Sequence, residues 1–315
     1  MADTFEELHE QERRRAEWEQ RVREVEKNVN RKEVTLNADN YVVMANNMVL
    51  HSASNLNLNE LKLLRFIIMQ TERGDSDLFE FDVSVKDLCK LIGIKNNKDI
   101  YKRIDTMTTH LMQEVIRIGD DSKQEWRKFH WVDVCEYRKG IITIKLSDQL
   151  KPFLIGLRGC FTRYQLSEII SLKSTYAIRI YEIINGYLSE NNLPHADVAI
   201  EFSISIDEIR RVTNTEKKFE RYSSFKTYVI DTALKEINEK SKYFVTATPY
   251  KRGRAVVGFE FLIESQVGHT VKMQRQNKEI KTQADTVQMD GQMNLMDYQQ
   301  GDNDFYVSAA GQQDK

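Results

Sequence analysis

An internal repeat limits the possible folds of this chain more than any other feature of its sequence. The segment FEFDVSVKDL at residues 79–88 aligns with IEFSISIDEI at residues 200–209, at an offset of 121 residues. Downstream of both, the tripeptide IDT at residues 104–106 aligns with IDT at residues 230–232, at an offset of 126, which fits a longer turn in the second copy. One such match can arise by chance, but both halves also predict the same order of helices and strands, which indicates a duplication.

The first copy predicts a domain over residues 41–150 in which helical and strand periodicities alternate. Apolar residues at helical spacing, a capping asparagine and a terminal glycine mark the helices. Segments rich in valine, isoleucine, tryptophan and threonine mark the strands. The expected elements are a helix over 60–71 capped by Asn59, a strand over 78–84, a helix over 85–92 ending at Gly93, a helix over 98–115, and a hairpin formed by 125–137 and 140–146.

Residues 151–265 predict connecting helices followed by the second copy. In its last strand Val257, Phe259, Phe261 and Ile263 occupy alternate positions, so they share one face. A unit of helix, strand, helix, helix and hairpin is typical of a winged helix-turn-helix domain, so we expect an α+β chain with two such domains in tandem. The expected elements are helices over 147–188, a strand over 200–203, helices over 205–212 and 222–240, and a hairpin over 243–264.

The helix over 222–240 is expected to be the recognition helix of the second domain, because the second helix of a helix-turn-helix lies in the major groove. Phe225, Val229, Ala233 and Ile237 form its buried stripe. Projected at about 100° per residue, the opposite face carries short polar and carboxylate side chains, which can form hydrogen bonds with base edges. The candidate base-contact residues are Ser223, Ser224, Thr227, Tyr228 and Asp231.

The distribution of charge supports this placement. The whole chain has a net charge of −2, but residues 215–254 hold ten cationic and five acidic side chains, a net charge of +5 that leaves −7 for the rest. A basic face on an acidic chain directs that face towards DNA, and the turn over 251–254 is expected to be a wing on the phosphate backbone. In the first domain Asp99 and Asp105 offset the local cations, so contact with phosphates is expected there rather than base reading. The candidate phosphate-contact residues are Lys217, Lys218, Arg221, Lys226, Lys251, Arg252 and Arg254, with Lys98 and Lys102 from the first domain.

The sequence lacks the motifs of nucleotide-binding P-loop enzymes and of DNA-nicking enzymes. It has no phosphate-binding P-loop, and no two histidines flank one hydrophobic residue, as a metal-dependent DNA-nicking enzyme would require. Cys89, Cys135 and Cys160 have neither disulfide nor zinc spacing, and we expect them to be reduced core residues. We therefore expect no enzyme activity, no metal and no cofactor, with DNA nicking as the enzymatic alternative. No apolar run approaches ~20 residues and no secretory signal is present, which predicts a cytoplasmic protein without a membrane partner.

Two flanking segments fall outside the repeat. Residues 1–40 are dense in glutamate and arginine and predict a charged helical arm, with a partner-binding coiled coil as the alternative. Residues 266–315 are polar and predict a disordered tail. In this tail Gln292 and Leu295 resemble the glutamine–leucine peptide with which bacterial proteins bind the polymerase sliding clamp, so they are candidate clamp-binding residues; an inert tail is the alternative.

Several segments resemble the iteron-binding initiator replication proteins of theta-replicating plasmids. The most specific is SLKS at 171–174 followed by YAIRIYE at 176–182. LKEIN at 234–238, the hairpin over 251–261 and FTRY at 161–164 are also similar to that family. The resemblance covers about residues 41–265. It departs from the family at residues 226–228, where KTY stands in place of several arginines, so the DNA sequence recognised is expected to differ.

The resemblance implies two winged-helix domains with pseudo-twofold symmetry. It implies an initiator that binds direct repeats in double-stranded origin DNA, helps to open the duplex and recruits host replication proteins. The second domain would read the repeat, and the first would hold the backbone and form the dimer contact. Monomers would initiate, whereas homodimers would be inactive or repress their own gene. A chromosomal transcription regulator with duplicated winged helices is the alternative.

Residues 125–146 of the first domain also predict self-association from their own sequence. Trp126, Phe129, Trp131 and Val134 combine apolar bulk with an outer strand edge, which pairs readily with a second copy unless it is blunted. The alternative is that these side chains face only their own core.

Overall fold

The computed structural model describes residues 9–18, 20–21, 31–52, 55–120, 124–191 and 199–274. Both expected domains are present, each with the same sheet order. In the first, an antiparallel sheet has the order β2-β6-β5, and in the second the order is β8-β10-β9, so the strand before the helix-turn-helix pairs with the last strand of the hairpin in both. This shared topology confirms an α+β chain with two tandem winged helix-turn-helix domains.

The first domain and the segment that follows it contain twelve named elements within the described residues. They are β1 (Tyr41–Ala45), α2 (Asn46–His51), α3 (Leu58–Met69), β2 (Phe81–Ser84), α4 (Val85–Ile92), α5 (Ile100–Gln113), β3 (Val115–Asp120), β4 (Glu125–His130), β5 (Val132–Arg138), β6 (Ile141–Leu146), η2 (Asp148–Leu150) and α6 (Lys151–Leu154).

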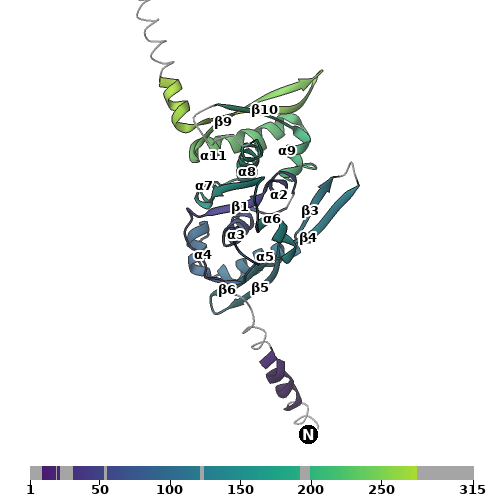
Figure 1. Ribbon diagram of the computed structural model, residues 1–315, viewed down its shortest axis with the longest axis vertical. Helices are drawn as coiled ribbons and strands as arrows, with labels where there is room; N and C mark the ends of the chain where they lie inside the picture. Colours follow the sequence, from purple (N-terminus) through teal and green to yellow (C-terminus); the bar gives the residue numbers. More distant parts are fainter. Residues whose placement is uncertain are drawn as a thin grey trace, which may run out of the picture.

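The linking segment and the second domain follow in the chain. Their helices and strands are β7 (Phe161–Gln165), α7 (Leu166–Ile170), α8 (Thr175–Glu190), β8 (Ile200–Ser205), α9 (Ile206–Val212), α10 (Tyr222–Phe225), the π-helical segment η3 (Lys226–Asp231), α11 (Thr232–Lys240), β9 (Tyr243–Arg252) and β10 (Ala255–Ser265). Figure 1 shows two lobes, with α3, α4 and α5 in one, α8, α9 and α11 in the other, and β1 and α7 between them.

The segment between the domains contains a strand that we did not expect. We predicted only helices over 147–188, but β7 lies there and pairs antiparallel with β1, from Tyr41 opposite Gln165 to Ala45 opposite Phe161. Alternation in both strands buries Val42, Met44, Thr162 and Tyr164. The start of the first domain is therefore tied by backbone hydrogen bonds to the chain that leads into the second.

The β-rich part of the first domain forms two hairpins where we predicted one. The stretch 125–137 is broken at the fully buried Trp131, so β4 pairs with β3 and β5 pairs with β6. The expected helix over 98–115 ends at Gln113, and Val115 already belongs to β3. Figure 1 shows the β3–β4 hairpin projecting from the first lobe.

Three smaller expectations also change. The cap of α3 is Asn57, not Asn59: its side chain accepts from the backbone N–H of Glu60, and the Glu60 carboxylate accepts from the backbone N–H of Asn57. Residues 266–274 are helical, so the tail that we predicted to be disordered begins with a helix. Cys160 is exposed rather than in the core, whereas Cys89 is buried.

The candidate clamp-binding residues Gln292 and Leu295 lie outside the described residues, so their role stays a prediction. No helix in the described part of the chain is long and apolar enough to cross a membrane.

A buried ion-pair network joins the two domains along α8. The Glu182 carboxylate accepts from Arg65 of α3, at 3.0 Å for the Nη2–Oε2 pair, from Arg179 one turn earlier, and from the hydroxyl of Tyr164 at 2.6 Å. Burial by itself would raise the pKa of the Glu182 carboxyl, but the two guanidinium groups outweigh it and lower the pKa to about 2. A carboxylate in this position remains charged because its partners replace the water it has lost.

Arg179 extends this network to both domains. Its guanidinium donates to the backbone carbonyls of Val49 and Ser52 at the end of α2, and to that of Val212 at the end of α9. Helix α8 also packs closely against α2, because a methyl group added at Gly186 of α8 would lie 2.8 Å from the Leu50 side chain of α2. The domains are therefore packed directly on a shared helix.

Replacement of Glu182 by glutamine is expected to leave two buried guanidinium groups without a counterion. We predict a loss of about 3–5 kcal/mol in the free energy of unfolding, measured by urea denaturation at pH 7. Glu201→Gln, at an exposed position of β8, is the control and should change it by less than about 0.5 kcal/mol.

The pH dependence provides a second readout of the same change. The folded pKa of Glu182 lies near 2, below its ordinary value of 4.5, so its contribution is complete above pH 4.5 and is lost as the pH falls towards 2. Glu182→Gln should remove that part of the acid destabilisation. Equal acid sensitivity of both proteins would contradict a charged Glu182.

Candidate nucleic-acid interface

The helix-turn-helix of the second domain consists of α9, a turn over 213–221, and the continuous helix α10–η3–α11. Arg210 of α9 organises the turn: its guanidinium donates to the backbone carbonyls of Thr215, Lys218 and Phe219 at 2.7 to 2.9 Å. The same group lies 4.2 Å from the centroid of the Phe225 ring. The basic turn is therefore held rigidly against the start of the recognition helix.

The recognition helix has the buried face that the sequence predicts. Phe225, Val229, Ala233 and Ile237 are all fully buried. Ile230 is buried as well, because the π-helical segment η3 widens the apolar face by one residue. Of the candidate base-contact residues, Ser224 is half-buried, and the exposed ones are Ser223, Thr227, Tyr228 and Asp231.

Two of the residues predicted to contact DNA, Lys226 and Asp231, form an ion pair with each other. The Lys226 ammonium group lies 2.7 Å from a carboxylate oxygen of Asp231, five residues along, and the hydroxyl of Thr232 donates to the carbonyl of Thr227, also five residues back. This spacing follows the wider turn of η3. For Asp231 to contact a base, or Lys226 a phosphate, this ion pair would have to open, or its side chain would have to bind the DNA and its partner at the same time.

The other cations of this domain lie on the turn before the recognition helix and around the tip of the β9–β10 hairpin. Lys217, Lys218 and Arg221 are exposed on the turn that precedes the helix. At the tip of the hairpin Gly253 has a φ of +64°, which allows the tight reversal that the sequence predicts. Lys251, Arg252 and Arg254 are exposed around this tip.

In the first domain the structure presents aromatic side chains that the sequence analysis missed. Lys102 is exposed in the first turn of α5, and Lys98 is exposed just before it, because α5 begins at Ile100. Beside them Tyr101 is 56% exposed and packs edge-on against Tyr137 of the wing strand β5, with ring centroids 4.8 Å apart. A helical projection of α5 is enough to place Tyr101 outside its buried stripe.

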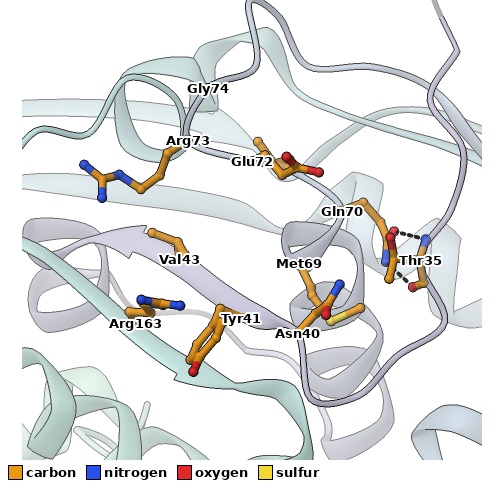
Figure 2. A pocket seen from close by; sticks show the side chains of 11 residues that line it. Thr35, Asn40, Tyr41, Val43, Met69, Gln70, Glu72, Arg73, Gly74 and Arg163 are labelled. Carbon is orange, nitrogen blue, oxygen red and sulfur yellow. Dashed lines mark hydrogen bonds between the residues drawn. The ribbon is translucent and has the colours of Figure 1, made fainter.

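A separate concave surface lies beside the β1–β7 ribbon. Figure 2 shows Arg163 and Tyr41 lining it, with Arg73 from the turn after α3. The pocket has a volume of about 430 Å³, and the Arg163 guanidinium lies 3.5 Å from the centroid of the Tyr41 ring. None of the residues predicted to contact DNA lines this pocket, so it is distinct from the candidate interface. Among the described residues no group of three His, Cys, Asp or Glu side chains is placed to hold a metal ion.

Two family models match the chain. The model described as "Initiator Replication protein, WH1" matches residues 41–185, and the model described as "Initiator Rep protein, WH2" matches residues 205–263. The first match ends within α8, so it includes β7 and most of the helix that joins the domains. The two matches also agree with the repeat seen in the sequence.

Individual proteins are similar to the chain at lower identity. The PI protein of Escherichia coli is 28% identical over 142 residues, which span 40% of this chain and 45% of the relative. The matched segment is thus less than half of that relative's length. A solved structure described as the crystal structure of Pi initiator protein in complex with iteron DNA has a TM-score of 0.60 at 19% identity, covering 73% of this chain and 98% of that one. At this identity the likeness shows the fold.

The family models together span well over half of the chain, and they fall on the two winged-helix domains that the structure contains. The chain therefore belongs to the initiator replication protein family.

Proposed function

We propose that this protein initiates plasmid replication by binding direct repeats, or iterons, in double-stranded origin DNA. The observation that carries the proposal is the second winged-helix domain, in which an exposed polar helix face follows an exposed basic turn and precedes an exposed basic wing along a chain of the initiator family. Its fold is similar to that of the Pi initiator protein solved with iteron DNA. After binding, the protein would help to open the duplex and recruit host replication proteins without catalysing a reaction itself.

The second domain would supply the sequence specificity. A helix in the major groove reads bases with the side chains of its first turns, which here are Ser223, Thr227 and Tyr228. The cations of the turn and of the wing would contact phosphates on either side. The first domain would hold the backbone with Lys98 and Lys102 and form the homodimer contact, leaving the monomer as the active form.

The β3–β4 hairpin is the part of the first domain best suited to the dimer contact. Within the described residues it is a two-stranded sheet without a third strand on either side. Trp126 on its outer face is 58% exposed, and Val134 of β5 is also exposed, whereas Phe129 and Trp131 are buried in the domain's own core. Of the four apolar residues considered for self-association, two therefore remain available.

Base-reading and phosphate-contacting side chains should respond differently to substitution. Thr227→Ala and Tyr228→Ala should each weaken specific binding by about 1–3 kcal/mol, because each removes a contact to a base edge. Lys251→Ala and Arg254→Ala should weaken binding to origin and random DNA alike and lower the salt slope by about one unit each. Binding titrations of the full-length protein at several salt concentrations measure both effects.

Lys272→Ala is the matched control, since it removes an exposed cation of the helix that follows this domain, where it pairs with Glu264 away from the wing. It should leave the salt slope unchanged. If Thr227→Ala and Tyr228→Ala keep the full preference for the repeats over random DNA, the assignment of the recognition helix is wrong.

Self-association is tested with a charge on the exposed tryptophan of the hairpin. Trp126→Glu should shift the full-length protein from dimer towards monomer in sedimentation equilibrium, because a carboxylate cannot be buried at an apolar interface without a partner. Trp18→Glu, at a similarly exposed tryptophan in the helical residues 9–18, is the control. The full chain is required, since a fragment ending at residue 150 would lack β7, the partner of β1. Equal masses for both variants would remove the dimer contact from this hairpin.

A further inference from the structure

The backbone of Phe219 is strained at the end of the helix-turn-helix turn. Its φ is +54°, in the left-handed region that bulky side chains rarely occupy. Such a conformation persists only where the surroundings over-determine it, and it is concentrated at functional sites. Here the surroundings include Arg210, whose guanidinium donates to the Phe219 carbonyl at 2.7 Å.

The strained residue places its ring directly beneath a recognition tyrosine. The rings of Phe219 and Tyr228 are stacked, with centroids 5.6 Å apart and planes inclined by 28°. Phe219 also packs edge-on against Tyr176, in the first turn of α8, with ring centroids 6.2 Å apart. The three rings thus form a continuous series of contacts from the helix shared by both domains to the solvent face of the recognition helix.

Tyr228 is well exposed although its ring is supported by Phe219. Tyr228 remains 58% exposed on the same face as Thr227 and Ser223. An unsupported tyrosine at an exposed helical position samples several rotamers, whereas stacking on Phe219 favours one. A single direction of the ring is what a base-reading residue requires, because such contacts depend on side chains locked by the residues around them.

We propose that Arg210 and Phe219 are positioning residues that fix the Tyr228 ring for contact with a thymine methyl group in the major groove. The ring offers an apolar face, and thymine is the base that presents a methyl group there. This inference rests on the proposed function and deepens it by naming the base and the residues that act through Tyr228. Neither Arg210 nor Phe219 need touch DNA.

The test begins with a duplex that the full-length protein selects from a random-sequence library. Each thymine of that duplex is replaced singly by deoxyuridine, which removes only the methyl group. The wild-type protein should lose about fourfold in affinity at one thymine or a neighbouring pair, the effect of one buried methyl group. Phe219→Leu should reduce that loss to less than about twofold, because it keeps apolar bulk but removes the stacked ring.

Two variants separate positioning from a general loss of structure. Phe219→Tyr retains the ring and should retain the deoxyuridine effect. Phe244→Leu removes a ring of the same domain that stacks on His269, and it should retain the effect as well. Arg210→Lys keeps the positive charge but cannot donate to three carbonyls from one planar group, so it should reduce the effect as Phe219→Leu does. Arg210→Lys also decides the question if Phe219→Leu fails to fold, as judged by circular dichroism.

The outcomes distinguish this inference from the proposed function. If the wild-type protein selects a specific duplex but no thymine is sensitive to deoxyuridine, the inference is overturned and the proposed function stands. An undiminished deoxyuridine effect in folded Phe219→Leu or Arg210→Lys overturns it too. If the protein selects no sequence at all, the proposed function fails and the inference fails with it.

Discussion

The buried carboxylate of Glu182 and its two guanidinium partners are the interaction on which the arrangement of the two domains depends. Charges removed from water are costly unless they are paired, so breaking this network would be strongly unfavourable. Arg65 comes from α3, Tyr164 from β7, and Arg179 also binds the carbonyl ends of α2 and α9. A shift of one domain relative to the other would leave charged groups unpaired. The two helix-turn-helix units are thereby held in one relation, as binding of both to a single DNA duplex would require.

The motif that resembles the initiator family forms this junction rather than the DNA-binding face. Ser174 caps α8, Tyr176 supports Phe219, and Arg179 and Glu182 belong to the ion-pair network. The preceding loop is held by α11, since the Lys240 ammonium group donates to the carbonyl of Ser171. A sequence can therefore indicate the family clearly even where the residues proposed to read DNA, here 226–228, depart from the pattern expected of that family.

Local patterns predicted the elements whose partners are close in sequence. The repeat, the α4 helix with its terminal Gly93 and the wing around Gly253 all followed from periodicity and turn chemistry. The β1–β7 pair was missed because two short strands from distant parts of the chain show their complementarity only when they are placed together. The single predicted hairpin became two because a run of strand-forming residues does not reveal that Trp131 turns into the core.

The predicted interface was defined less completely than the fold. Helical projection identified the exposed face with Thr227 and Tyr228, but it assumed regular α-helical spacing and so missed the Lys226–Asp231 pair that the π-helical segment brings together. Arg210 acts through backbone carbonyls, whose directions leave no trace in the sequence. The positive φ of Phe219 is equally invisible before the turn is seen.

Footprinting of the full-length protein on the DNA that flanks its own gene tests the central claim most directly. A monomer with two winged-helix domains held in one orientation should protect a series of direct repeats, each spanning about two successive major grooves on one face of the duplex. Protection of a single inverted repeat would indicate a dimeric transcription regulator instead. The absence of any protected repeat, at concentrations where random DNA is bound, would contradict sequence-specific initiation by this chain.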